Sequence, residues 1–111
     1  MRERIVERLA AGEIVHGYRE SGNSMTPIIE HRQPVDLAPI IDPTALRKGD
    51  IVFCRVAGNF YLHLVNATAE GRVQIASNKG RINGWTSHAN VYGIVVAVDG
   101  THRRNSQHPA P

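Results

Sequence analysis

Two residues of this chain have types and neighbours that could perform chemistry together, a serine at a bend and a histidine in an apolar segment. Ser24 lies in residues 22–27 (Gly-Asn-Ser-Met-Thr-Pro), where a flexible glycine and a rigid proline favour a turn that exposes the hydroxyl. His63 lies in residues 61–65 (Tyr-Leu-His-Leu-Val). A serine hydroxyl is a weak nucleophile until a neighbouring base removes its proton, and histidine, with an ordinary pKa of about 6.5, suits that role. If the fold brings the two together, a serine hydroxyl beside an imidazole could carry out acyl transfer.

The same bend has to supply the N–H donors that stabilise a tetrahedral oxyanion. The backbone N–H of Ser24 is the first candidate, and its neighbours at the bend, Asn23 and Met25, are the others. Gly22, two positions before the serine, has no hydroxyl that could add a side-chain donor to these backbone groups. The sequence therefore predicts an oxyanion site made from backbone groups alone.

The elements that must position these residues are mostly strands. Val and Ile dominate the apolar segments, and both residue types favour sheet over helix. We expect strands over residues 35–41, 51–56, 60–66, 72–77 and 91–98, the first of them at a sheet edge and the last buried on both faces. Residues 12–23 are expected to be extended or loop, and residues 78–90 to form a polar loop.

One helix is expected, over residues 2–10, where Ile5, Val6 and Leu9 share a face. Ala11-Gly12 is a plausible stop. The chain then reads as a single mainly β domain over residues 1–98, with residues 1–12 as helix and lead-in. From residue 99 to residue 111 the chain is polar and contains proline, which predicts a disordered tail.

Composition narrows the class of protein. The 111 residues carry a formal net charge of +3 with scattered positive charges, which argues against nucleic acid as a partner. Cys54 is the single cysteine, which excludes an internal disulfide, and we expect it to be a small buried core residue. The histidines lack the spacing of metal ligands, so we expect no metal and no cofactor. No apolar run is long enough to span a membrane, and the charged first 15 residues are unlike a secretory signal. The expectation is a soluble, cytoplasmic protein without a membrane partner.

Residues 22–27 resemble the nucleophile motif Gly-x-Ser-Met-x-Pro of the signal-peptidase and LexA-like serine proteases. Three further segments resemble that family in the same order: a Gly-Asp turn within residues 46–52, the strand of residues 61–65, and an apolar closing strand over residues 91–98. Bacterial signal peptidases and LexA-like proteins carry a lysine base on the second segment, whereas archaeal and endoplasmic-reticulum signal peptidases carry a histidine, and this chain resembles the histidine form. The resemblance implies a twisted, coiled β-sheet domain, a Ser24–His63 dyad, and hydrolysis of a peptide or protein substrate.

Histidine-type relatives often carry an aspartate that orients the imidazole, in a loop with the sequence Gly-Asp-Asn. The corresponding loop of this chain has Ser77 and Asn78, and residues 72–98 contain no acidic side chain. Ser77 and Asn78 are the candidate orienting residues, and they could hold the tautomer of the imidazole without stabilising its charge. Asp36 and Asp50, from elsewhere in the chain, are alternative acidic partners for the His63 imidazole.

The resemblance also predicts which segments should accompany the domain. LexA-like proteins carry an N-terminal helix-turn-helix and signal peptidases a membrane anchor, and the residues before Ser24 resemble neither. This argues against DNA binding by the chain itself and against processing at a membrane. Ala11-Gly12 is the type of dipeptide at which LexA-like proteins cleave themselves, so self-processing at this bond is a hypothesis.

A different class of function stays open beside the enzyme. Ser24 also suits an ordinary turn, and a histidine on an apolar strand is commonly a core or surface residue. The alternative is a catalytically inactive β-domain that binds a protein partner or forms a homodimer through exposed strand edges. Trp85 and its basic neighbours could stack on a nucleic-acid base, although a loop tryptophan more often caps a core. The distance from the Ser24 hydroxyl to the His63 ring separates the enzyme from the binding module.

Overall fold

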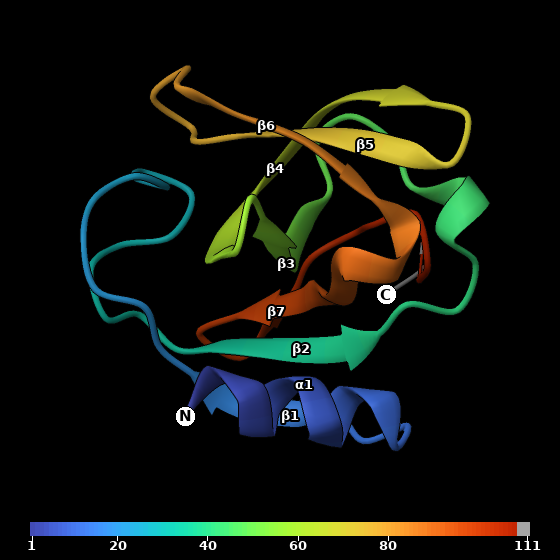
Figure 1. Cartoon of the computed structure of the whole chain (residues 1–111). Helices are drawn as coiled ribbons and strands as arrows, with labels where there is room; N and C mark the ends of the chain where they lie inside the picture. The colour runs from blue at the N-terminus through green and yellow to red at the C-terminus, as the bar shows by residue number, and fades with distance from the viewer. Residues whose placement is uncertain (109–111) are drawn as a thin grey trace.

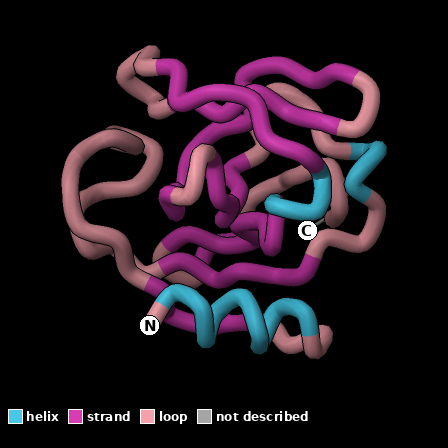
Figure 2. Tube along the Cα trace, viewed as in Figure 1, coloured by secondary structure: helices cyan, strands magenta, loops and turns pink. Residues whose placement is uncertain are grey.

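The structure of the chain, a computed structural model, describes residues 1–108 and is built mainly from strands. Within these residues one α-helix precedes eight strands, and the strands make up one antiparallel sheet (Figures 1 and 2). The elements are α1 (Arg2–Ala10), β1 (Val15–Tyr18), β2 (Val35–Pro39), β3 (Ile51–Val56), β4 (Asn59–Ala69), β5 (Arg72–Ala76), β6 (Ile82–Ser87), β7 (Val91–Val98) and β8 (Thr101–His102), with 3-10 turns η1 (Pro43–Ala45) and η2 (His88–Asn90). Among the described residues, no helix is long and apolar enough to cross a membrane.

The sheet runs in the order β1-β2-β7-β3-β4-β5-β6, with β8 paired to β7. It coils, so that β6 at one end of this order returns to contact β3. Thr86 Oγ1 donates to the carbonyl oxygen of Arg55 over 2.7 Å, and a Cβ on Gly84 would lie 3.3 Å from Val56. The predicted mainly β domain with one short N-terminal helix is therefore confirmed, and its coil brings two strands distant in the sheet order into contact.

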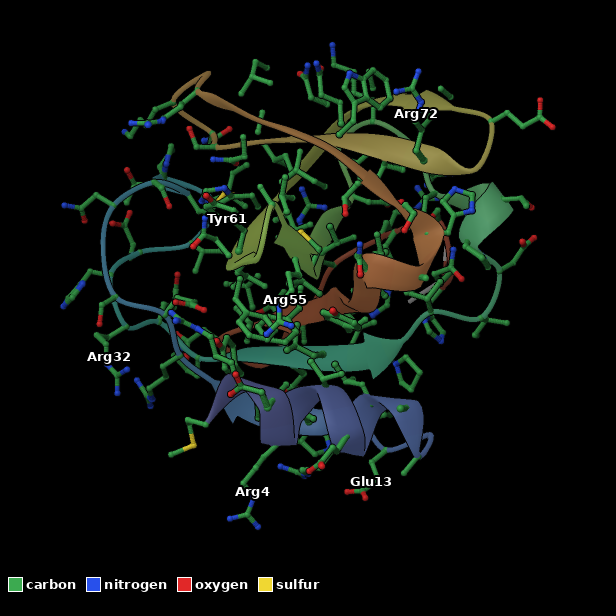
Figure 3. All side chains as sticks on the ribbon, viewed as in Figure 1. Arg4, Glu13, Arg32, Arg55, Tyr61 and Arg72 are labelled. Atoms are coloured by element: carbon green, nitrogen blue, oxygen red, sulfur yellow. The ribbon has the colours of Figure 1, made fainter. Side chains whose placement is uncertain are left out.

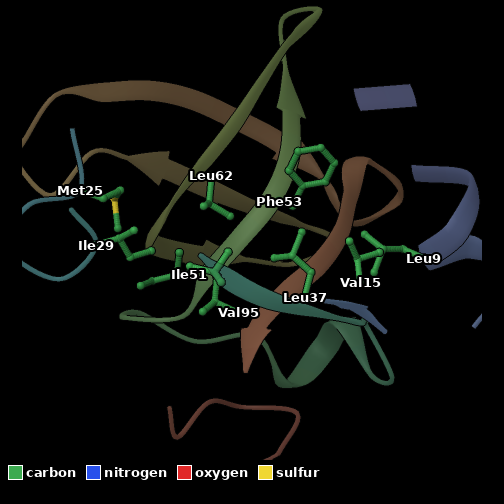
Figure 4. Close-up of a cluster of buried hydrophobic side chains, with 10 residues drawn as sticks. Leu9, Val15, Met25, Ile29, Leu37, Ile51, Phe53, Leu62 and Val95 are labelled. Atoms are coloured by element: carbon green, nitrogen blue, oxygen red, sulfur yellow. The ribbon is translucent and has the colours of Figure 1, made fainter. Parts of the chain in front are cut away.

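The coiled sheet encloses two clusters of buried apolar side chains. Strand β3 contributes to both, because its alternate residues point to opposite faces. Ile51 and Phe53 belong to the cluster beneath α1 and the β1–β2 loop, whereas Val52, Cys54 and Val56 belong to the cluster on the other face. Figure 4 shows the first cluster, to which α1, the β1–β2 loop and the strands β1, β2, β3, β4 and β7 contribute side chains. Burial raises the pKa of the Cys54 thiol to about 12, which fits an unreactive core residue.

Two segments of the sheet differ from their predicted structure or place. The predicted polar loop over residues 78–90 contains β6, which pairs along its length with β5. Strand β6 alternates poorly between apolar and polar side chains because it is an edge strand with exposed residues and a glycine in its centre. Strand β2, predicted at a sheet edge, instead lies between β1 and β7.

The segment after β7 also differs from the predicted disordered tail. Asn105 is 1% exposed, and the buried Asp50 carboxylate accepts hydrogen bonds from the backbone N–H and the hydroxyl of Ser106. Gln107 Oε1 accepts from the backbone N–H of Ile41 over 2.8 Å. Polar hydrogen bonds rather than apolar burial attach this segment, so hydropathy gives no sign of it. The last predicted residues of the tail, 109–111, lie outside the described residues.

The approach of α1 to the sheet depends on a glycine in β7. A Cβ built on Gly93 would lie 2.8 Å from Leu9 Cδ1 and 3.1 Å from the backbone oxygen of Ala38. Gly93→Ala is therefore expected to lower the free energy of unfolding by about 1–3 kcal/mol, because an added methyl group overpacks this contact. Urea denaturation monitored by circular dichroism measures the effect. Ala69→Ser, an exposed change at the end of β4, is the control and leaves the midpoint unchanged, and an equally unchanged midpoint in Gly93→Ala would contradict the close approach.

Candidate active site

The β1–β2 loop presents Ser24 on an exposed turn whose neighbours are anchored in the core. Ser24 is exposed, while Met25 and Ile29 are each 5% exposed. The turn is closed by a 3.2 Å hydrogen bond from Thr26 N–H to the carbonyl oxygen of Asn23 and a 3.0 Å bond from Ile29 N–H to that of Met25. Met25 and Ile29 thus anchor the turn in the first apolar cluster (Figure 4), while Ser24 itself is exposed.

A second loop, the turn between β5 and β6, holds the serine turn from the other side. The backbone N–H of Asn78 donates to the carbonyl oxygen of Ser24 over 2.9 Å. The Asn78 side-chain amide donates to the carbonyl oxygen of Thr26, also over 2.9 Å. These two bonds use backbone oxygens of the serine turn and leave the Ser24 hydroxyl free for another partner.

That partner is His63. Its Nε2 atom lies 3.0 Å from Ser24 Oγ, within the range for a hydrogen bond between a nucleophile and its base. His63 stands on β4, opposite Val52 of β3, and is 9% exposed. Two strands that flank β4 in the sheet, β3 and β5, hold its backbone, so the imidazole reaches Ser24 from a rigid element.

The other ring nitrogen of His63 contacts a residue of β6. Nδ1 lies 2.7 Å from Oδ1 of the half-buried Asn83. With the Asn83 oxygen as acceptor, the Nδ1 atom carries the proton and Nε2 is left as an acceptor for the Ser24 hydroxyl. The three side chains form one chain of hydrogen bonds in the order of a nucleophile, a base and a residue that orients the base.

The environment of His63 favours its neutral form. Burial lowers the pKa of the imidazole below its ordinary value, while the hydrogen bond to Asn83 and the charge of Glu20 act in the opposite direction. A base has to be neutral before it can accept a proton. The lowered pKa therefore keeps His63 ready to act as a base at neutral pH.

The candidate orienting residues from the sequence have other roles. Ser77 Oγ accepts from the backbone N–H groups of Lys79 and Arg81, and Asn78 binds the serine turn. Asp36 accepts from the Gly17 N–H, and Asp50 binds the chain near residues 47 and 106. None of these four has a hydrogen bond with His63 among the described residues. Asn83, which contacts His63 instead, was missed because it stands on a strand whose sequence predicts a loop.

Of the residues predicted to form the oxyanion site, two have backbone N–H groups that are unbonded in the described part of the chain, and one closes the turn. Within residues 1–108, the backbone N–H groups of Ser24 and Met25 donate to no backbone carbonyl. Both are therefore available to a bound group. The Asn23 carbonyl closes the turn, which makes Asn23 a structural residue of the bend.

The hydrogen-bonded chain opens into a cleft of about 530 Å³. Its walls are the β1–β2 loop and the β5–β6 turn, and its floor is formed by β4. Figure 3 shows Tyr61, one of the floor residues, between the loop and the sheet. Among the described residues, no group of three or more His, Cys, Asp or Glu side chains could hold a metal ion. The Ser24 hydroxyl and the His63 imidazole both line this cleft.

No protein-family model, curated protein or solved structure matches this chain. The geometry of Ser24, His63 and Asn83 is therefore the basis for a functional proposal.

Proposed function

We propose that the protein is a serine peptidase in which Ser24 is the nucleophile, His63 the general base and Asn83 the residue that orients the base. The observation that carries the proposal is the chain of two hydrogen bonds, 3.0 Å from Ser24 Oγ to His63 Nε2 and 2.7 Å from His63 Nδ1 to Asn83 Oδ1. Three side chains from a loop and two strands meet in this order at a cleft. A turn serine or a core histidine with only a structural role does not require such a meeting.

The proposed reaction follows from the positions of the atoms. Ser24 Oγ attacks the peptide carbonyl carbon as its proton passes to His63 Nε2. The carbonyl oxygen becomes an oxyanion, and the backbone N–H groups of Ser24 and Met25 are its proposed donors. The proton on Nε2 then passes to the leaving amine as the C–N bond breaks, giving an acyl-enzyme. A water molecule, deprotonated by His63, hydrolyses this ester and returns the enzyme to its starting state.

The resemblance to the signal-peptidase and LexA-like serine proteases supports the choice of substrate class. The motif around Ser24, the Gly49-Asp50 turn before β3, the histidine on β4 and the apolar strand β7 occur in the family's order on a coiled antiparallel sheet. We therefore place this chain as a histidine-base form of that type. Self-processing at Ala11-Gly12 is not part of the proposal, since this bond lies at the end of α1 and neither residue lines the cleft.

A fluorophosphonate probe, which phosphonylates activated serine residues, tests the proposal. The intact protein is expected to take up one probe per chain at Ser24, located by mass spectrometry of the digested protein. Ser24→Ala and His63→Ala are expected to remain unlabelled, while Ser21→Ala, which removes a second hydroxyl lining the cleft, labels as fast as the original protein. Circular dichroism shows whether each variant is folded. Absence of labelling in the folded original protein would refute the serine peptidase.

One observation favours the alternative of an inactive binding module. The edge strand β6 exposes two large apolar residues, Ile82 and Trp85, which are 47% and 39% exposed. An exposed edge with apolar side chains can pair with a protein partner or with a second copy of the chain. A folded protein that is unlabelled by the probe and dimerises in analytical ultracentrifugation would favour this module.

A further inference from the structure

The turn between β5 and β6 forms a rigid wall of the cleft. The backbone N–H of Ser77 donates to the carbonyl oxygen of Arg81 over 2.9 Å, and that of Gly80 donates to Ser77 over 3.1 Å. The buried Ser77 hydroxyl accepts from the backbone N–H groups of Lys79 and Arg81 at 3.3 and 3.2 Å. Four hydrogen bonds centred on Ser77 therefore hold the two basic residues of this turn in place.

The same turn is attached directly to the proposed nucleophile. Asn78, adjacent to Lys79, donates its backbone N–H to the carbonyl oxygen of Ser24 and its side-chain amide to Thr26, each over 2.9 Å. Lys79 and Arg81 both line the cleft that contains Ser24 and His63. A substrate group bound by these side chains would thus lie close to the bond that is cleaved.

The charges of Lys79 and Arg81 are unpaired, whereas much of the opposite charge in the cleft is already paired. Both side chains are exposed, and neither forms an ion pair with any residue in the described part of the chain. On the opposite wall, Glu20 pairs with Arg2 over 2.9 Å and accepts from the Tyr18 hydroxyl. Glu30 is the remaining acidic residue of the cleft lining. The β5–β6 turn therefore presents two free positive charges against one free negative charge.

From this arrangement we infer that the substrate is a peptide segment with an acidic side chain near the cleaved bond, bound by Lys79 and Arg81. The inference rests on the proposed peptidase and names the substrate class of the same site. A carboxylate can accept two hydrogen bonds from the guanidinium of Arg81 while Lys79 adds a second positive charge. Because both cations are exposed, the expected preference is modest, roughly fivefold for an acidic over a neutral segment.

Competition with the fluorophosphonate probe measures this preference without a known substrate. Three pools of decapeptides carry two Glu, two Gln or two Lys residues at matched positions, with randomised neutral residues elsewhere. The Glu pool is expected to slow labelling of the original protein at a concentration roughly fivefold lower than the Gln pool. The difference should shrink as salt is raised from 0.05 to about 0.5 M, because salt screens exposed charges.

The double variant Lys79→Gln/Arg81→Gln provides the decisive comparison. Its rate of labelling without peptide is measured first and serves as its own reference, and relative to that rate it is expected to lose the preference for the Glu pool. Arg47→Gln/Lys48→Gln, which removes the same charge from exposed residues outside the cleft lining, is the control and keeps the preference.

Each other outcome of the competition overturns the inference. Equal competition by the three pools, no competition by any pool, stronger competition by the Lys pool, or a preference that persists in Lys79→Gln/Arg81→Gln would do so while labelling still supports the peptidase. Failure of the original protein to label would instead refute the peptidase, and with it the substrate class.

Discussion

Replacing His63 by alanine is expected to lower the rate of Ser24 chemistry by about 10⁴-fold. The imidazole is the base on which the proposed mechanism depends, and a serine hydroxyl without a base is a weak nucleophile. The measurement is turnover of p-nitrophenyl acetate, an activated ester suited to a serine hydrolase of undefined sequence preference. Spontaneous hydrolysis of the ester without protein is subtracted as background.

Non-additivity gives the sharper version of this experiment. If Ser24 and His63 act as one unit, the double variant is no slower than either single variant. His102→Ala, which removes an exposed histidine from β8, is the matched control and keeps the original rate. His63→Gln, close in size to the original residue, separates loss of the base from loss of packing at this buried position. A folded His63→Ala that retains more than a tenth of the original rate would exclude His63 as the base.

Elements that are apolar and local in sequence could be predicted without the structure. Residues 2–10 form α1 as expected from the spacing of Ile5, Val6 and Leu9. Strands β3 and β7 also lie where apolar runs predict them. In these segments, burial on one or both faces leaves a direct trace in the residue types.

Elements held by polar contacts at the edge of the fold could not be predicted in the same way. Strand β6 has a glycine at its centre and exposed side chains, so its pairing with β5 leaves no apolar alternation. The segment around Ser106 is attached through hydrogen bonds to the buried Asp50. Hydropathy patterns are insensitive to contacts of this kind, which depend on where distant parts of the chain meet.

The same distinction applies to the site. Ser24 and His63 could be selected because each lies in a motif with a recognisable order along the chain, and their side chains lie 3.0 Å apart. Asn83 could not be selected, since its role depends on the coil that turns β6 toward β4 rather than on its neighbours in sequence. Ser77 and Asn78 were chosen by their position in a loop that resembles a family motif. In the structure Asn78 binds the turn that contains Ser24, and Ser77 binds backbone groups of the turn between β5 and β6.

Asn83 provides the second large expected effect, because an amide can orient an imidazole but adds no negative charge. Asn83→Ala removes the acceptor for the Nδ1 proton, so the ring can rotate or take the other tautomer. We expect kcat for p-nitrophenyl acetate to fall by about 10²–10³-fold, since a wrongly oriented or tautomerised base is a severe defect in related constellations. An unchanged rate in a folded Asn83→Ala would show that the 2.7 Å contact has no catalytic role.

Asn83→Asp tests the same contact through charge. Burial holds the pKa of His63 below its ordinary value, so the rate of the original protein should rise with pH through a midpoint below about 6.5 and level off near neutrality. A carboxylate at position 83 stabilises the imidazolium and is expected to raise this pKa by about 1–2. The acidic limb of the pH–rate profile then moves to higher pH, and the rate on the plateau is kept or increased because charge developing on His63 is better stabilised. Asn59→Asp, which adds the same charge at the exposed start of β4 outside the cleft lining, should leave the profile in place. Identical profiles for the original protein and Asn83→Asp would mean that the group titrating in the rate is not the imidazole bound to Asn83.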